Sequence, residues 1–166
     1  MTELIARVMM DMSMLYAGDA ARIQHFTKVY AYAGIIGREE GMNEPSLETL
    51  CLAALTHDIG IHLCEEKYGC CDGALQQKEG PALAKTLLSK AGAQPATIER
   101  VCFLVAHHHT AKDIDALDWQ VLLEADFLVN GFEESLSQAA LENAYDTLFV
   151  TQTGKQLLSA MFDLNR

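Results

Sequence analysis

The sequence predicts an all-α fold, a single-domain helical bundle, and three observations support this. Apolar residues recur at helical spacing in successive segments, whereas no alternating apolar and polar pattern of useful length occurs. The length of 166 residues matches the usual size of one domain. Half of the residues are hydrophobic and three are proline, a composition that provides a core and excludes a disordered or collagen-like chain.

The first three helices are indicated by apolar periodicity and by the residues that interrupt it. One helix covers residues 5–16 and is interrupted at Gly18. A second runs over about residues 20–40, with the following glycine as its stop. A third follows a Glu-Pro-Ser segment, where Ser46 is a candidate N-cap, and it ends at residues 57–60.

The middle of the chain is predicted to contain a long loop and two helices. Residues 62–77 have glycines, charges and no sustained period, which is typical of a loop, and loops of this length are often functional. Gly80-Pro81 is predicted to open a helix that ends at Ala91-Gly92. The next helix starts near Ala96 and runs into His107-His108-His109.

The last third of the chain is predicted to form three further helices. The first covers roughly residues 119–129 and stops at Asn130-Gly131, and the others lie around residues 135–148 and 153–164. We therefore expect one domain over residues 1–166. Its motif-bearing core spans about residues 20–130, and the C-terminal helices of residues 135–164 pack on this core.

Charge and hydropathy narrow the possible partners. The formal net charge of −11 disfavours wide contact with polymeric nucleic acid, which depends on Lys and Arg. No apolar run approaches the roughly 18 residues that span a bilayer, and the N-terminus lacks the pattern of a secretory signal. We expect a cytoplasmic protein with no membrane partner, and its Met-rich helical faces are compatible with a homodimer.

Four chemistry-bearing side chains fall on or at the ends of apolar helical faces: His25, His57, Asp58 and Asp126. Each alone is more often a hydrogen-bonded core or capping group. Together they favour a shared metal ion, because burying isolated charge is costly and a cation is a strong partner. Two imidazoles and two carboxylates suit a divalent transition metal, namely Mn²⁺, Fe²⁺, Co²⁺, Ni²⁺ or Zn²⁺.

An ordered series of segments resembles the HD-domain phosphohydrolase superfamily over roughly residues 20–129. The series comprises HFTKVY with His25, THDIG at residues 56–60, EGPALA at 79–84, VAHHHT at 105–110 and EADFL at 124–128. The resemblance implies an all-α fold and metal-dependent hydrolysis of a small phosphorylated substrate, most notably a nucleotide. It also implies that the single-metal site of the family corresponds to His25, His57, Asp58 and Asp126.

Related members hold a second metal with further histidines, and the resemblance supplies candidates for it: His62, His107, His108 and His109, with Glu79 as an acidic possibility. The chain departs from the family where many members have Lys in place of Ile61. It departs again at Gln76-Gln77, where they have a His before a glycine-rich turn. The two-metal pattern is therefore incomplete.

We predict that Asp58, His62 and His108 carry the catalytic chemistry. Substrate binding is predicted for Arg22, one helical turn before His25, and for Glu79, His107 and His109. The alternative for His62 is a solvated loop residue. The three consecutive histidines could instead interact with a helix C-terminus, and Glu79 with a helix start.

Two further hypotheses stay open. Some HD-fold members that resemble this pattern are di-iron oxygenases. That function would require extra metal ligands from the second set of candidates, which are His62, Glu79, His107, His108 and His109. The small size also fits a non-catalytic sensing or interaction module on an HD fold. The intact set of four family ligands counts against such a module.

Overall fold

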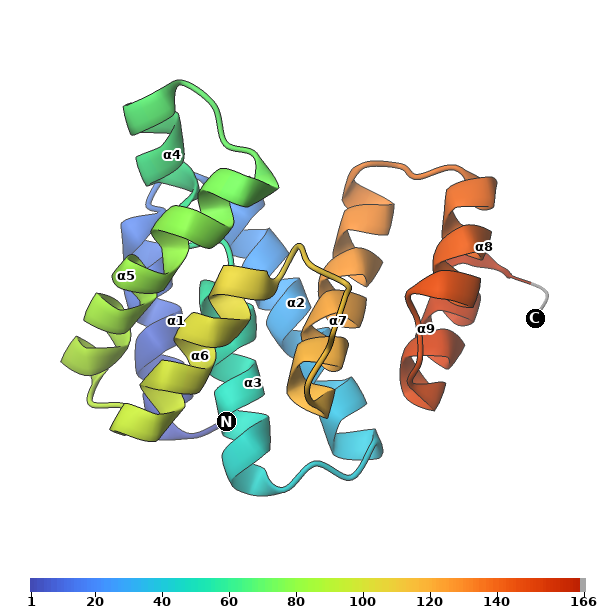
Figure 1. Cartoon of the computed structure of the whole chain (residues 1–166), viewed down its shortest axis with the longest axis horizontal. Coiled ribbons are helices and arrows are strands. Elements are labelled where there is room, and N and C mark those ends of the chain that lie inside the picture. The colour runs from blue at the N-terminus through green and yellow to red at the C-terminus, as the bar shows by residue number, and fades with distance from the viewer. Residues whose placement is uncertain (165–166) are drawn as a thin grey trace.

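The computed structural model describes residues 1–164, so residues 165–166 of the predicted domain lie outside the described part. Within it every regular element is an α-helix and no strand occurs, which confirms the predicted all-α class (Figure 1). The helices in chain order are α1 (Glu3–Leu15), α2 (Ala20–Glu39), α3 (Glu44–Thr56), α4 (Ile61–Tyr68), α5 (Gly73–Ala91), α6 (Pro95–His107), α7 (Leu117–Glu133), α8 (Gln138–Thr147) and α9 (Gln152–Phe162).

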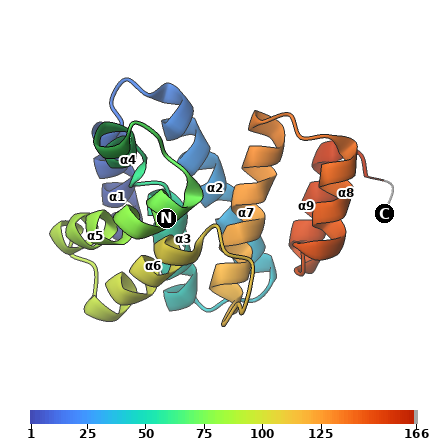
Figure 2. The same ribbon diagram turned by 45° about the horizontal axis from the view of Figure 1, so that its top comes forward.

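The central helices are α2, α3 and α7. Helix α2 packs against both α3 and α7, while α3 also contacts α1 and α6, and α5 packs along α6. Helix α3 is buried at most of its positions, including Leu50 and Leu55, because neighbours cover it on several sides. Helices α8 and α9 lie side by side beyond α7 in both views (Figures 1 and 2).

The N-terminus of α3 differs from the prediction, because the cap is Asn43 and not Ser46. The side chain of Asn43 accepts a hydrogen bond from the backbone N–H of Ser46 at 3.0 Å. Pro45 occupies the first turn, where its missing N–H costs no helical hydrogen bond. The capping residue therefore has to precede the proline.

The predicted loop over residues 62–77 is wrong, since most of it is helical. Helix α4 ends at Gly69, which has a φ of 71°, and α5 begins after Asp72, whose carboxylate accepts from Leu75 N at 2.9 Å. Gly80-Pro81 lies inside α5 and does not open it. An added Cβ at Gly80 would lie 2.8 Å from Val105 Cγ1, so this glycine serves close packing of α5 on α6.

Asn130-Gly131 does not end α7, which continues to Glu133. A Cβ at Gly131 would lie 3.2 Å from Phe162 Cζ and 3.3 Å from Leu141 Cδ2. The glycine thus allows α8 and α9 to approach α7. Its role is again packing between helices, which sequence periodicity does not reveal.

A buried carboxylate fastens the C-terminal helices to α7. Glu124 is fully buried, and its Oε1 accepts from Gln120 Nε2 at 2.7 Å, Val150 N at 2.7 Å and Thr151 N at 3.0 Å. The hydroxyl of Thr151 donates to Oε2 and also accepts from Gly154 N at 2.9 Å, which caps α9. This network fixes the start of α9 against the helix that carries Asp126.

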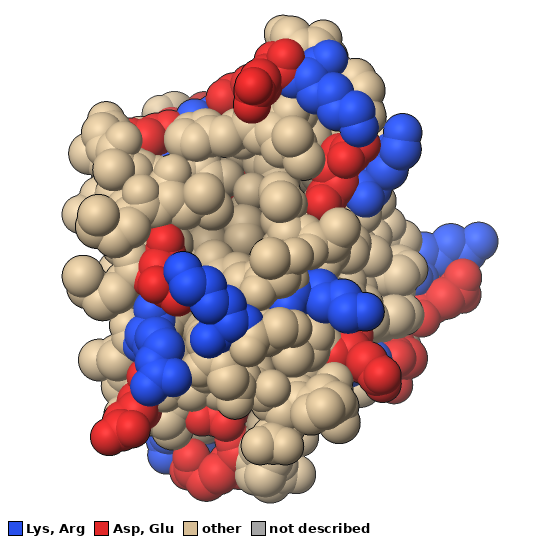
Figure 3. Space-filling view, turned by 90° about the vertical axis from the view of Figure 1, so that its left-hand side faces the viewer, with Lys and Arg blue, Asp and Glu red and all other residues tan. Residues whose placement is uncertain are grey.

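The surface seen from the left of Figure 1 has basic and acidic side chains side by side, without a continuous patch of one sign (Figure 3). Among residues 1–164, no helix combines the length and apolar character needed to cross a membrane.

Candidate metal centre

Two consecutive helices, α2 and α3, and the distant helix α7 bring the four predicted ligands together. His25 lies in α2, His57 and Asp58 follow the last turn of α3, and Asp126 lies in α7. Because α2 packs against both other helices, these positions face one another. His25, His57 and Asp126 are buried, and Asp58 is half-buried.

The donor atoms of these side chains form one compact group. Nε2 of His25 and Nε2 of His57 are 3.2 Å apart, and Asp126 Oδ1 lies 3.2 Å and 3.4 Å from them, respectively. Asp58 Oδ2 lies 3.6 Å from His25 Nε2 and 3.4 Å from His57 Nε2. Ligands at about 2.0–2.2 Å from a transition metal are separated by distances of this order. His25, His57 and Asp58 therefore could bind a metal ion, and Asp126 Oδ1 lies beside both imidazoles.

Hydrogen bonds on the far side of each imidazole set its orientation. His57 Nδ1 donates to the carbonyl oxygen of Ala54 at 2.9 Å, and His25 Nδ1 donates to Glu133 Oε2 at 2.8 Å. Glu133 is also paired with Lys28. In a neutral imidazole these contacts keep the proton on Nδ1, so the Nε2 lone pair faces the cluster, as metal-binding histidines require.

The observation that most favours a bound cation is Asp126 Oδ1. This atom is buried and accepts no hydrogen bond within residues 1–164, although the Nε2 atoms of His25 and His57 lie 3.2 Å and 3.4 Å from it. A buried carboxylate oxygen without a partner costs free energy, which a bound cation would offset. The residues present therefore fit a metal ion.

The cluster also shifts the protonation of its members. Burial lowers the pKa of His57, but the carboxylates of Asp58 and Asp126 outweigh it and raise this pKa to about 9. Burial raises the pKa of Asp58, yet His57 and His108 lower it to about 2. For Asp126, the same opposition with His25 and His57 holds the pKa well below its usual range.

His108 and His109 form a second group around the other oxygen of Asp58. His108 Nδ1 donates to Val105 O at 2.7 Å, and its Nε2 lies 3.4 Å from Asp58 Oδ1. Gln76 Oε1 lies 3.2 Å from His108 Nε2 and 3.0 Å from His109 Nε2. Asp58, His108 and His109 could hold a further ion, with Gln76 beside them where the resemblance led us to expect histidine.

His107 is not brought to the cluster. Its Nδ1 donates to Phe103 O at 2.7 Å, and its ring stacks on Phe103 and contacts Trp119. These contacts direct the His107 ring toward α7, away from the group that His108 joins. The structure gives no support to the predicted substrate-binding role of His107.

Arg22 lines the cavity beside His25, whereas His62 is not among the residues that line the cavity. The Arg22 guanidinium forms ion pairs with Asp19 and with Glu65 Oε1, the second at 2.6 Å. His62 is partly exposed, lies 3.4 Å from Asp19 Oδ2 and contacts the ring of Tyr16. His62 is therefore connected to the cavity through Asp19, which pairs with Arg22.

Glu79 lies outside the cavity and joins α5 to α4. Its Oε1 accepts from Tyr68 OH at 2.5 Å and pairs with Lys67 Nζ at 3.0 Å. Because Tyr68 and Lys67 already bind the Glu79 carboxylate, its predicted direct role in substrate binding has no structural support.

A cavity of about 270 Å³ opens on the cluster. Its polar lining includes four residues that the sequence analysis missed as site residues: Gln76, Asn130, Glu133 and Glu134. Helical spacing could have identified Asn130, Glu133 and Glu134, because they lie four, seven and eight residues after Asp126 and so share its face of a helix. The predicted stop at Asn130-Gly131 concealed this face.

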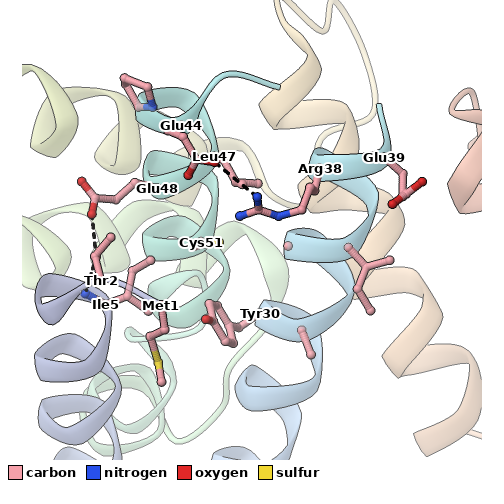
Figure 4. Close-up of a pocket in the computed structure, with 14 residues that line it drawn as sticks. Met1, Thr2, Ile5, Tyr30, Arg38, Glu39, Glu44, Leu47, Glu48 and Cys51 are labelled. Atoms are coloured by element: carbon pink, nitrogen blue, oxygen red, sulfur yellow. Dashed lines mark hydrogen bonds and ion pairs between the residues drawn. The ribbon is translucent and has the colours of Figure 1, made fainter. Parts of the chain in front are cut away.

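A larger hollow of about 630 Å³ lies between α1, α2 and α3 and is shown in Figure 4. Four of its polar residues are paired with one another: Thr2 donates to Glu48, and Arg38 pairs with Glu44. Among the described residues, neither candidate metal-binding group lies in this hollow. It offers no comparable chemistry.

Comparison with known proteins agrees with this geometry. A sequence model of the HD domain matches residues 22–144, a stretch that contains all four clustered side chains. The chain belongs to the HD-domain family. The predicted resemblance is thereby confirmed.

A crystal structure of a predicted HD superfamily hydrolase from an uncultured Thermotogales bacterium is similar to this HD-domain protein. The TM-score is 0.68 at 21% sequence identity, over 95% of this chain and 84% of the other. At this identity the likeness shows a shared fold. No curated protein matches the chain.

Proposed function

We propose that this HD-domain protein is a divalent-metal-dependent phosphohydrolase that acts on a phosphorylated small molecule, with a nucleotide as the favoured substrate. The observation that carries the proposal is the convergence of two imidazoles and two carboxylates, one of which has a buried oxygen, Asp126 Oδ1, that accepts no hydrogen bond within residues 1–164. Membership of the HD-domain family supports it.

His25, His57, Asp58 and Asp126 would hold the ion. A divalent metal bound there supplies Lewis acidity toward a phosphoryl oxygen and lowers the pKa of a bound water. The mixed nitrogen and oxygen donors suit Mn²⁺, Fe²⁺, Co²⁺, Ni²⁺ or Zn²⁺.

The remaining roles fall to side chains that line the cavity or border on it. Asp58 orients the attacking water, because one of its oxygens faces the imidazoles and the other faces His108. In its imidazolium form, His108 donates the Nε2 proton to the leaving oxygen. Arg22 and His109 line the same cavity and bind the phosphate.

The test is metal analysis of protein purified without added ions, followed by a phosphatase and pyrophosphatase screen over nucleotides. Exhaustive chelation should abolish turnover, and one of the candidate ions should restore it. Full activity after chelation would contradict the proposal.

Asp58→Asn should lower kcat/KM by at least about 100-fold, because it removes both a ligand and the group that orients water. The matched control is Asp115→Asn, which changes a carboxylate that pairs with Arg100 far from the cluster. Circular dichroism should show that both variants fold. Normal turnover by folded Asp58→Asn would exclude this role.

A di-iron oxygenase is the second candidate, and one observation favours it: the two oxygens of Asp58 face two separate groups of possible ligands. Elemental analysis showing a single metal per chain at full occupancy would exclude it. A non-catalytic module would be excluded by metal-dependent turnover of any phosphorylated metabolite that Asp58→Asn abolishes.

A further inference from the structure

A second cavity, of about 360 Å³, adjoins the one that opens on the metal cluster. The two cavities share four lining residues, which are His109, Asp126, Asn130 and Glu134. A molecule that places one end at the cluster can therefore extend its other end into this second cavity. Its volume falls in the range of small-molecule sites.

Half of the ten residues that line the second cavity are apolar, whereas the cavity at the cluster is lined almost entirely by polar residues. The walls of the second cavity come from α7, from the connection that precedes it and from the segments that flank α8 (Figure 1). The apolar lining residues are Ala111, Leu123, Phe127, Leu136 and Leu148. Such a surface favours an uncharged organic group, whose burial removes apolar area from water.

Two contacts hold these walls in place. The ring of Phe127 packs edge-on against Phe149, with centroids 5.7 Å apart and planes at 82°. The backbone N–H of Leu136 donates to Gly131 O at 3.0 Å, which closes the turn after α7. The cavity is therefore preformed, which reduces the entropy lost on binding.

The polar groups at the boundary specify the ligand further. The half-buried amide of Asn130 lines both cavities, and it offers both a donor and an acceptor. No Lys or Arg lines this cavity in the described part of the chain, so it lacks a counter-charge for an anion. The lining suits a neutral ring with polar edges.

We propose that this apolar cavity is the subsite for the organic part of the substrate, a neutral aromatic or heteroaromatic ring linked to the phosphate at the metal cluster. This inference rests on the proposed phosphohydrolase function. It assigns Asn130, Phe127 and Leu136 to substrate selection and leaves the hydrolytic step to the cluster.

Direct binding tests the inference without turnover. Isothermal titration calorimetry of the Mn²⁺-loaded protein compares phenylphosphonate with methylphosphonate, which carry the same anionic head. Phenylphosphonate should bind about tenfold more tightly, because only its ring reaches the apolar walls. A parallel comparison of adenosine monophosphate and phenyl phosphate as substrates distinguishes a nucleobase from a plain aryl ring.

Two variants alter the cavity in opposite ways. Ala111→Trp fills it from an exposed position, and Leu136→Asn makes one wall polar. Both variants should reduce the ratio of the affinity for phenylphosphonate to the affinity for methylphosphonate to near one. Methylphosphonate binding itself should be unchanged. The matched control, Ala139→Trp, adds the same bulk at an exposed position on α8 outside the cavity and should keep the ratio.

Each result separates the two proposals. Equal affinity for the two phosphonates, or an unchanged ratio in both cavity variants, overturns the subsite even if metal-dependent hydrolysis is found. An equal loss of preference in Ala139→Trp also overturns it. If neither phosphonate binds the metal-loaded protein, the proposed function is contradicted, and the subsite inference is contradicted with it.

Discussion

His57 and the two aspartates of the cluster make the stability of the metal-free protein depend on pH. The raised pKa of His57, about 9 against 6.5 unfolded, adds stability that is complete below pH 6.5 and disappears as pH rises through 9. The lowered pKa values of Asp58 and Asp126 add stability above pH 3.8, the unfolded value. The metal-free protein should thus lose stability above pH 6.5 through His57 and below pH 3.8 through the two aspartates.

The expected loss between pH 6.5 and 9.5 is on the order of 2–3 kcal/mol of unfolding free energy. Urea unfolding of metal-free protein at the two pH values measures it. His57→Gln serves as the control, because it removes the titrating group and should flatten this dependence. A wild-type stability that is constant over this interval would contradict the electrostatic account of the cluster.

Glu133 acts on the metal through His25. Because its carboxylate accepts the Nδ1 proton of His25 at 2.8 Å, Glu133→Gln should lower metal affinity about 10–100-fold. Competition with a chelating indicator measures the change. Glu99→Gln, at an exposed position on α6, is the control and should leave affinity unaltered. Equal affinity in both variants would show that the contact with His25 has no effect on the metal.

The three consecutive histidines show what a single residue position cannot reveal from sequence. Helical spacing predicts that at least one ring follows the inward face, and His108 does so. Its neighbour His107 instead stacks on Phe103. The choice depends on where α6 ends and on what packs there, and both are tertiary properties.

Among the helices, α5 gives the sharpest prediction. Gly80→Ala would place a methyl group 2.8 Å from Val105 Cγ1, which is fully buried. We expect a loss of about 1–3 kcal/mol in unfolding free energy, because α5 and α6 must separate. Chemical denaturation measures it.

Gly34→Ala is the matched control on α2. Its added Cβ would meet only Cys51 Sγ, at an ordinary 3.8 Å, so better helix propensity should make the change neutral or slightly stabilising. Val105→Ala should partly rescue Gly80→Ala. Equal stability of the two Gly→Ala variants would refute close packing as the role of Gly80.

Helices α4 and α5 also show why a local pattern failed. Glycines and charges over residues 62–77 suggested a loop, yet Cys64 is fully buried within a helix. Gly69 and Asp72 act as caps for two adjacent helices, so the breaker residues mark a short connection. A helix as short as α4, with 8 residues, is stabilised mainly by tertiary packing, which periodicity does not measure.

At the scale of the whole molecule, Glu124 couples the C-terminal helices to the helix of the cluster. Glu124→Gln presents an amide N–H₂ to several backbone and side-chain donors, so at least one hydrogen bond is lost. We expect a loss of about 2–4 kcal/mol in unfolding free energy. Backbone amides of α8 and α9 should exchange faster with solvent.

Hydrogen exchange followed by mass spectrometry resolves this effect by segment. Glu99→Gln is again the control and should leave the exchange of α8 and α9 as in the wild type. Protection of these helices that is unaltered in Glu124→Gln would mean that apolar packing alone holds them on α7.

The sequence by itself determined the all-α class, most of the helices and the four residues that converge on one point. This was possible because helical periodicity is local and shows which side chains must face inward, and because buried His and Asp require partners. Only the tertiary structure decided that His108 joins the site, that His107 and Glu79 stay outside it, and that Gln76 and Asn130 line the cavities. These outcomes depend on how distant helices pack, and packing is set by contacts such as Gly80 on Val105 that no local pattern contains.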